Sequence, residues 1–393
     1  MRGFKQFAFS SVVASLAIAM AGGLFLSTWK IKEGAQNSFR LSSGGFDAVL
    51  GARGSKLQLI LNSVFHIEAS PGNLDWEQYE LIKQNRAVKE AYPIAVGDNY
   101  MGYRLVGTLP SLFENHEWRK GEKYKIKKGG RIFSEFNKEA LVGSYVANKL
   151  GLRLGDTFHP YHGLTFKEES KHNDIYTVVG ILGQTGTPSD KVIWIPIMGI
   201  QNMEGHSAEH SNSVSAVLLN LRGAAGFALE MKYNKQGDVA TFAWPIPAIL
   251  ADFFDRLTWF EKILQWIAYL IGLMSTLIIL SVLRSSLNER KREFAIIRCL
   301  GASRSFVTCV VLGQSLIISA VGALGSLLIY FLTSSIATFF IRENTGVMIE
   351  PFQWDMIFIH VIYGTLLLGL ISGVIPAISA YRVEISKSLQ QNS

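Results

Sequence analysis

The sequence predicts an α-helical membrane protein with four transmembrane helices and an α+β extracytoplasmic domain inserted between helices one and two. Four apolar runs approach or exceed the roughly 20 residues that a helix needs to cross a bilayer core. Between the first two runs, short apolar stretches alternate with Gly, Pro, Asn and Asp, which is typical of an α+β domain and not of a linker. The four runs are Phe7–Trp29, Ile263–Val282, Phe306–Phe331 and Phe358–Ile378.

The composition fits a membrane anchor joined to a soluble domain. Of the 393 residues, 49% are hydrophobic and 18% are charged, so the chain is more apolar than most soluble proteins. The net charge of +7 could suggest nucleic acid, but the basic residues gather beside the apolar runs. We therefore expect contacts with membrane lipids and no nucleic acid. The only cysteines, Cys299 and Cys309, lie in the membrane part, so we expect no disulfide in the external domain.

The first apolar run has two possible identities. Arg2 and Lys5 precede it and small residues occupy 21–23, as in a cleaved signal peptide. However, the run continues through Leu24, Phe25 and Leu26, and the apolar region of a signal peptide has only roughly 7 to 15 residues. The sequence therefore favours a retained helix.

The loop between runs two and three determines the predicted orientation, because cytoplasmic loops carry an excess of Lys and Arg. We expect a multi-pass inner-membrane protein with both termini in the cytoplasm and the large domain in the periplasm. Lys30 and Lys32 lie on the unfavoured side, which long translocated domains tolerate. The loop contains Arg284, Arg290, Lys291, Arg292, Arg298 and Arg304, whereas the loop after run three has Arg342 against Glu343, Glu350 and Asp355.

Three segments follow from this layout. Residues 1–29 are the first helix with a short cytoplasmic arm, 30–256 are the external domain, and 257–393 hold the other three helices. The stretch Pro245–Leu257 predicts a helix that runs unbroken from the domain into the second span. Within the domain, the patterns predict strands at 91–96, 103–109, 176–182, 192–197 and 214–221, and helices at 75–84, 141–150 and 224–233.

The segment 289–304 in the basic loop has the pattern of a short amphipathic helix. Its basic residues suit a membrane surface, and Phe294, Ile297 and Leu300 could enter a groove on a partner. Gly301 is a typical residue for the end of a helix. The alternative is an ordinary positively charged loop.

Three motifs together resemble the MacB/FtsX-like family of ABC transporter permeases. The segment 289–304, ERKREFAIIRCLGASR, is similar to the family signature E-R-x-R-E-[FI]-A-[IL]-[LI]-[RK]-A-[LI]-G-A-[ST], although Cys299 stands where alanine is common. The C-terminal IPAISAYR (375–382) resembles the P-A-x-x-A motif of the last span, and LVGSYVA (141–147) with YTVVGIL (176–182) resembles the core of the outer domain. The resemblance covers essentially the whole chain.

The resemblance implies a separate ABC ATPase that docks on segment 289–304. The sequence has no G-x-x-x-x-G-K-[ST] loop for nucleotide phosphates, so we expect no enzyme and no cofactor in this chain, with ATP and Mg²⁺ bound by the ATPase. Two permease copies, and possible contact with a periplasmic adaptor or lipoprotein, are further implications. The expected coupling residues are Glu289, Arg290, Arg292, Glu293, Phe294, Ile297, Arg298, Leu300 and Gly301.

Histidines in the external domain form a second candidate site. Imidazoles are common ligands of transition metals, but single imidazoles on polar loops are usually just solvated. The candidate ligands are His159, His162, His172, His206 and His210.

Three functions are compatible with these features. The first is ATP-driven movement of the external domain for export or extraction of a periplasmic or outer-leaflet substrate. The second is regulation of a periplasmic cell-wall hydrolase by that movement. The third is handling of a metal or metallophore through the histidines.

Overall fold

The computed structural model describes residues 2–203, 212–237, 240–348 and 354–382. They form two compact units, each described by itself. The helical unit consists of Met1–Gly34, Leu257–Thr338 and Glu350–Ser393, and the sheet unit consists of Ala35–Arg256 and Phe339–Ile349.

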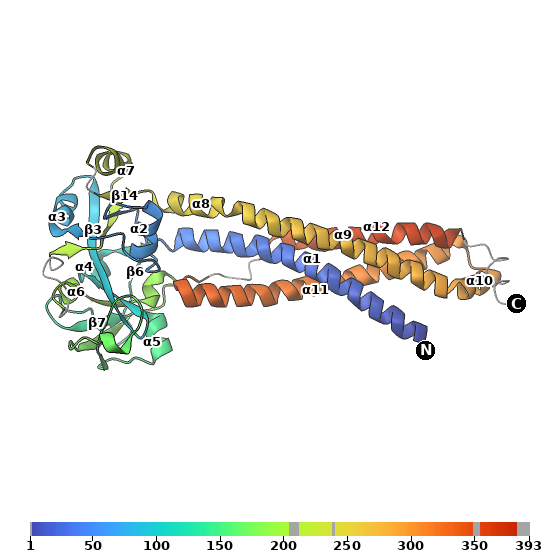
Figure 1. The fold of residues 1–393 in the computed structure, drawn as a ribbon, viewed down its shortest axis with the longest axis horizontal. Helices are drawn as coiled ribbons and strands as arrows, with labels where there is room; N and C mark the ends of the chain where they lie inside the picture. The colour runs from blue at the N-terminus through green and yellow to red at the C-terminus, as the bar shows by residue number, and fades with distance from the viewer. Residues whose placement is uncertain (1, 204–211, 238–239, 349–353, 383–393) are drawn as a thin grey trace. The chain divides into compact units, whose positions relative to one another are not determined.

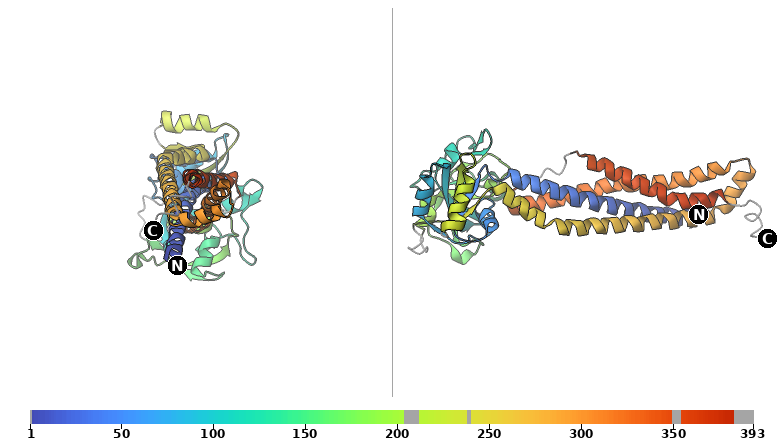
Figure 2. Two further views of the ribbon diagram at one scale, coloured as in Figure 1. Left: turned by 90° about the vertical axis from the view of Figure 1, so that its right-hand side faces the viewer. Right: turned by 90° about the horizontal axis from the view of Figure 1, so that it is seen from above.

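Four long helices account for most of the helical unit, where they lie side by side (Figures 1 and 2). All four are long and apolar enough to cross a membrane, so the predicted fold class of four transmembrane helices with an α+β insertion is confirmed. The helices are α1 (Arg2–Leu41), α9 (Thr258–Glu289), α11 (Arg304–Thr345) and α12 (Met356–Tyr381), and the short α10 (Lys291–Cys299) joins α9 to α11.

Small residues allow α1 and α12 to approach α11 closely. A Cβ atom added at Gly322 of α11 would lie 2.7 Å from Ile18 Cβ of α1, a distance too short for two carbon atoms. On another side of α11, Cβ atoms at Gly369 and Gly373 of α12 would overlap serine side chains of α11. Lipid tails are as apolar as the side chains, so helices in a bilayer associate through close contacts of this kind.

A ten-stranded mixed sheet forms the centre of the sheet unit (Figure 1). Neighbouring strands are antiparallel except for two parallel pairs, β11 with β4 and β10 with β7. The strand order is β14 (Thr241–Ala243), β1 (Ala48–Gly51), β13 (Ala216–Leu221), β3 (Val88–Tyr100), β4 (Tyr103–Thr108), β11 (Ile193–Pro196), β7 (Glu139–Val142), β10 (Tyr176–Ile181) and β8 (Thr157–Phe158), and β9 (Tyr161–His162) pairs with β3. Two short pairs are separate: β2 (Leu74–Asp75) with β12 (Ser213–Val214), and β5 (Glu117–Arg119) with β6 (Glu122–Lys123).

The sheet has a hydrophobic core on each face, because alternate strand residues point to opposite sides. Leu105 of β4 belongs to one core and its neighbour Val106 to the other. Helices α3 (Trp76–Lys83), α5 (Ser144–Leu150), α6 (Ile197–Gln201) and α7 (Gly226–Glu230) cover the first core. Helices α2 (Lys56–Ser63), α4 (Ser111–Asn115) and α8 (Ile246–Arg256) cover the second. The sheet unit also contains short 3-10 turns at Glu168–Ser170 and Pro188–Lys191 and a π-helical segment at Met231–Gly237.

Two expectations about helices are corrected by the structure. Residues 141–150 are not one helix, because 141–142 finish strand β7 and α5 starts only after Gly143. The helix expected to run unbroken into the second span is interrupted at Leu257, since α8 ends at Arg256 and α9 begins at Thr258. A short buried strand and a buried helical turn have the same apolar composition, so their hydrophobic pattern alone does not distinguish them.

One buried carboxylate makes the stability of the sheet unit dependent on pH. Glu139, at the start of β7, accepts hydrogen bonds from both terminal guanidinium nitrogens of Arg131 at 2.7 Å, and from the backbone N–H of Ser134 at 2.8 Å. These bonds, with Arg131 as the main cause, lower the pKa of Glu139 from its ordinary 4.5 to about 2. A carboxyl group whose pKa is lower in the folded state stabilises the fold above its unfolded pKa. This contribution is lost as pH falls from about 4.5 towards 2.

We expect Glu139→Gln to lower the melting temperature at neutral pH and to flatten the pH dependence of melting between about 4.5 and 2, because the amide does not titrate. Thermal unfolding of the purified full chain at a series of pH values measures this. Glu122→Gln, at an exposed position of β6, is the matched control. Equal pH slopes for the two variants would contradict the assignment.

Candidate functional site

Helix α10 and the turn that follows it form the candidate coupling site. The helix starts at Lys291 and is followed by Leu300 and Gly301. Gly301 has a φ of +103°, a conformation that side chains other than glycine rarely adopt, which explains glycine at this helix end. Backbone bonds from Gly301 to Arg298 O (3.1 Å) and from Ala302 to Ile297 O (3.2 Å) close the turn. The sequence pattern therefore places a compact helical corner between α9 and α11.

One face of α10 is packed into the helical unit. Phe294 is only 5% exposed and lies in a cluster with Leu283 and Leu287 of α9 and Val307 of α11, and Ala295 is fully buried. The Arg290 guanidinium lies 5.4 Å from the centre of the Phe294 ring and pairs with Glu293 at 2.8 Å. Phe294 is therefore a core residue that fixes α10, whereas its sequence pattern suggested a side chain available to a partner.

The outer face of α10 presents a different pair of apolar side chains. Leu300 is 83% exposed and Ile296 is 46% exposed. They are four residues apart, so they lie on the same side of a helix. Ile296 was not among the expected coupling residues, although its i,i+4 spacing from Leu300 could have indicated it. Among the expected residues, Glu289, Arg292, Glu293 and Gly301 are also exposed, and Arg290, Ile297 and Arg298 are half-buried.

The C-terminal end of α11, from residue 339 on, is anchored within the sheet unit. Val347, just after the helix, is fully buried in the core of the α2–α4–α8 face. The Lys191 ammonium donates to Asn344 O at 2.6 Å, and Lys149 pairs with Glu343 at 2.6 Å. Apolar burial and charged contacts therefore both hold this end of α11. The sequence analysis did not predict this contact, because residues 339–348 lie in the loop expected after the third apolar run.

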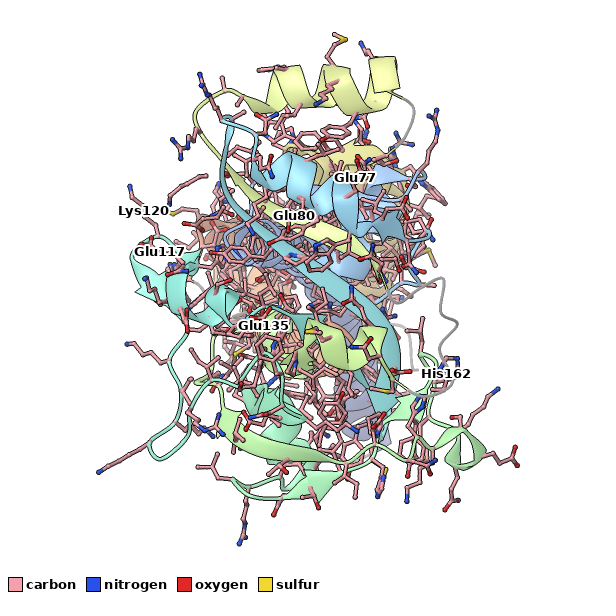
Figure 3. The ribbon with its side chains drawn as sticks, turned by 90° about the vertical axis from the view of Figure 1, so that its left-hand side faces the viewer. Glu77, Glu80, Glu117, Lys120, Glu135 and His162 are labelled. Carbon is pink, nitrogen blue, oxygen red and sulfur yellow. The ribbon has the colours of Figure 1, made fainter. Side chains whose placement is uncertain are left out.

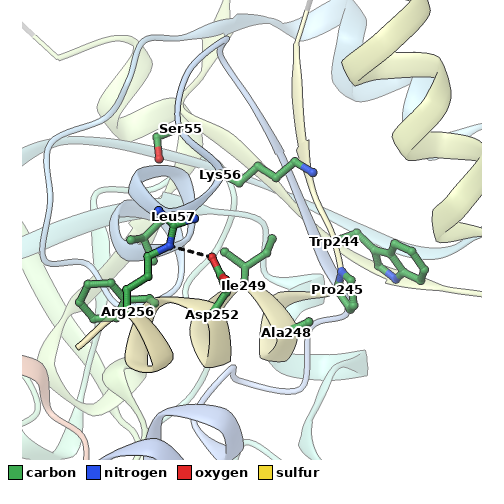
Figure 4. A pocket seen from close by; sticks show the side chains of 10 residues that line it. Ser55, Lys56, Leu57, Trp244, Pro245, Ala248, Ile249, Asp252 and Arg256 are labelled. Atoms are coloured by element: carbon green, nitrogen blue, oxygen red, sulfur yellow. Dashed lines mark hydrogen bonds and ion pairs between the residues drawn. The ribbon is translucent and has the colours of Figure 1, made fainter. Parts of the chain in front are cut away.

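A cavity of about 480 Å³ lies between the start of α2 and helix α8 (Figure 4). Its wall combines the ring of Trp244 with an ion pair between Arg256 Nε and Asp252 Oδ2 at 3.0 Å. It has apolar and charged walls, but the structure contains no group that identifies an occupant. The lining residues are Ser55, Lys56, Leu57, Trp244, Pro245, Ala248, Ile249, Asp252, Phe253 and Arg256.

The structure brings together only part of the expected histidine set. His162 of β9 and His172 lie beside Asp98 of β3, and their potential ligand atoms are all within 4.8 Å of one another. His159 is near, but its Nδ1 hydrogen-bonds to His172 O at 3.2 Å. The sequence analysis did not find Asp98. The two remaining candidates, His206 and His210, lie outside the described residues.

Comparisons with known families match both parts of the chain. The FtsX-like permease C-terminal family matches residues 266–385. The MacB-like periplasmic core domain matches residues 11–230, which is more than half of the chain. The comparison with curated proteins finds no match.

Two solved structures match about half of this chain at low identity. The periplasmic region of MacB from Actinobacillus actinomycetemcomitans is 13% identical, with a TM-score of 0.33, and the match covers 50% of this chain and 87% of that structure. The extracellular domain of the noncanonic ABC-type transporter YknZ from Gram-positive bacteria is 16% identical, with a TM-score of 0.31, and the match covers 49% of this chain and 97% of that structure.

The opposite environments of Phe294 and Leu300 lead to a stability prediction. We expect Phe294→Ala to destabilise the helical unit strongly, because emptying a packed phenylalanine site costs about 3–5 kcal/mol in protein cores. Leu300→Ala should leave the melting temperature nearly unchanged, because its side chain is 83% exposed. Thermal unfolding of both variants in detergent micelles tests this. Equal losses would show that the inward packing of α10 is wrong.

Proposed function

We infer the function from the family: this chain belongs to the MacB/FtsX-like family of ABC transporter permeases. We propose that it is the membrane subunit through which a separate ATPase moves an extracytoplasmic domain. Four apolar helices and the inserted α+β domain fit a multi-pass inner-membrane protein with a periplasmic domain. Work with a separate ATPase is general for the family. We propose that both termini and α10 face the cytoplasm, as the excess of Arg and Lys around α10 indicates.

The observation that carries the proposal is the exposed apolar pair on α10. Ile296 and Leu300 expose 46% and 83% of their surface, next to the charged side chains of Arg292 and Glu293. Burying one large aliphatic side chain stabilises a complex by roughly 1.5–3 kcal/mol, so this pair can hold the ATPase by entering a groove on its surface. The nucleotide and Mg²⁺ bind to the ATPase, and this chain supplies the contact that receives its movement.

Two features can carry the movement onward. Phe294 packs α10 against α9 and α11, so a displacement of α10 must shift both helices or break that core. Helix α11 then continues to residues that belong to the sheet unit, where Val347 is buried. The chain already connects the two units through α1, which leads into the sheet unit, and through α8, which leads out of it. We propose that α11 is a further mechanical link.

The substrate is proposed at the level of class: a molecule in the periplasm or the outer leaflet, exported or extracted as the sheet unit moves. A second copy of this chain and an adaptor or lipoprotein are proposed partners. Purifying the complex with its ATPase held in the ATP-bound state, and identifying what remains attached, tests this directly. An adaptor or outer-membrane duct supports export, whereas a cell-wall hydrolase supports the regulatory alternative.

We expect the double variant Ile296→Asp/Leu300→Asp to lose the ATPase, because charged side chains in an apolar groove leave buried carboxylates unpaired. Co-purification of the P-loop ATPase from native membranes measures the loss. The matched control is Phe136→Asp, which changes an equally exposed apolar residue (80%) of the sheet unit. Retention of the ATPase by the α10 variant, at the level of the control, would contradict docking at α10.

We expect Val347→Asp to uncouple the ATPase from the sheet unit, since a carboxylate in the core expels the end of α11. ATP hydrolysis should persist, while the ATP-dependent change in distance between spin labels on the two sheet units of a dimer should disappear. Glu343→Gln, which removes one ion pair at a partly exposed site, should keep the distance change, because such pairs contribute only about 0–1 kcal/mol. A normal distance change in a folded Val347→Asp protein would exclude α11 as a link.

A further inference from the structure

We propose that Asp98, His162 and His172 form a binding site for a divalent transition metal ion, with Zn²⁺ as the ion that the donor set fits best. The inference is independent of the permease function, because it depends only on residues of the sheet unit. Of the three candidate histidines that the structure describes, the site uses two, and it adds a carboxylate ligand.

The distances between the three side chains suit a single ion. Asp98 Oδ1 lies 3.4 Å from His162 Nδ1 and 3.4 Å from His172 Nε2. Ligands at about 2.0–2.2 Å from a tetrahedral zinc ion lie roughly 3.4 Å from one another. Both carboxylate–imidazole distances therefore match this spacing, and all three ligand atoms lie within 4.8 Å of one another.

A β-bulge directs Asp98 into the site. In the pairing of β3 with β4, Val96 lies opposite Val106, and Asp98 lies opposite Leu105. Leu105 and Val106 are adjacent, so they point to opposite faces of the sheet. Their partners Asp98 and Val96 therefore also point to opposite faces, whereas residues two apart on a regular strand share a face. Gly97 is the extra residue that causes this reversal. Asp98 thereby lies on the same face as His162, its direct partner in the β3–β9 pair.

Main-chain bonds hold the two histidines in place without help from a ligand. The backbone N–H of Gly163 donates to Gly97 O at 2.9 Å, and that of His172 donates to Pro160 O at 2.9 Å. The buried side chain of Asn99 donates to Gly163 O at 2.9 Å. His159 adds the contact to His172 O. The site is therefore preorganised by the fold, and an ion would connect strand β3 to the segment that carries both histidines.

The donor chemistry selects the class of ion. Two imidazoles with one carboxylate suit zinc, copper and nickel, whereas calcium and magnesium prefer sites made of oxygen donors. Asp98 is fully buried and His172 is 7% exposed, but the His162 side chain is 58% exposed. His162 lies at the edge of the sheet unit among exposed side chains (Figure 3). An ion can therefore enter past His162, and three protein ligands leave a fourth position open to water or an external donor.

Burial of Asp98 provides an energetic reason for a cation. A carboxylate removed from water is costly unless a positive charge or several hydrogen bonds compensate for it. A bound metal ion supplies such a charge beside Asp98. The two alternatives, a metal site and a simple Asp–His ion pair, differ in whether the protein retains an ion.

The experiment is a titration of the purified full chain, carrying an affinity tag without histidines, with Zn²⁺ after removal of metals by a chelator. Calorimetry should show that one Zn²⁺ ion binds per chain. His162→Gln should weaken this binding by at least 10-fold, and so should the near-isosteric Asp98→Asn. His360→Gln, at a histidine of the helical unit, is the matched control and should bind as the parent does. Co²⁺ in the parent should give the intense visible absorption of tetrahedral coordination, and His162→Gln should not.

Three results would overturn the site. The first is a parent chain that binds no Zn²⁺, and the second is a His162→Gln chain that binds it as tightly as the parent does. The third is loss of binding only in a His206→Gln/His210→Gln double variant. Thermal unfolding of the metal-free variants distinguishes loss of ligands from loss of fold, and His162→Gln should unfold like the parent because its side chain is largely exposed. The ATPase co-purification described above is expected to be normal in this variant, so the two proposals can fail separately.

Discussion

The close approach of α11 to its neighbours is the constraint on which the helical unit depends. In a bilayer no hydrophobic force drives helices together, so their association depends on how closely they can pack. Gly322 brings α11 against Ile18 of α1, and Gly369 and Gly373 bring α12 against α11. Side chains at these glycines would separate the helices. The proposed link from α10 to the sheet unit through α11 depends on these contacts.

Ion pairs resolve the one conflict that the orientation rule raised. In the expected orientation, Lys30 and Lys32 lie on the side of the membrane that disfavours cations. In the helical unit, Lys30 pairs with Asp355 at 3.0 Å and with Glu33 at 2.7 Å, and Lys32 pairs with Glu261. Each lysine is therefore neutralised by a carboxylate near the same helix ends. These pairs also connect α1 to α9 and to the start of α12, where a purely apolar contact would leave the charges unpaired.

The sequence predicted long elements and amphipathic patterns well and predicted local geometry poorly. The four spans and the amphipathic helix before Gly301 follow from hydrophobic runs, which directly reflect the need to bury apolar surface. The inward role of Phe294 and the outward role of Ile296 depend on how α10 is rotated against α9 and α11, and a single helix does not encode that rotation. Whether an ATPase docks at α10 stays a prediction.

Asp98 shows why the rest of the site could not be predicted. Strict alternation along β3 places residue 98 on the face of Val96, and only the extra residue at Gly97 reverses it. The bulge itself lies within the local β3–β4 hairpin, but the pairing of β9 with the same stretch of β3 joins segments that are far apart in the sequence. The three donors come from residues 98, 162 and 172, so the cluster forms only when the sheet has formed. The ligands of such a site can be identified in the sequence only after the strand pairing and its register are known.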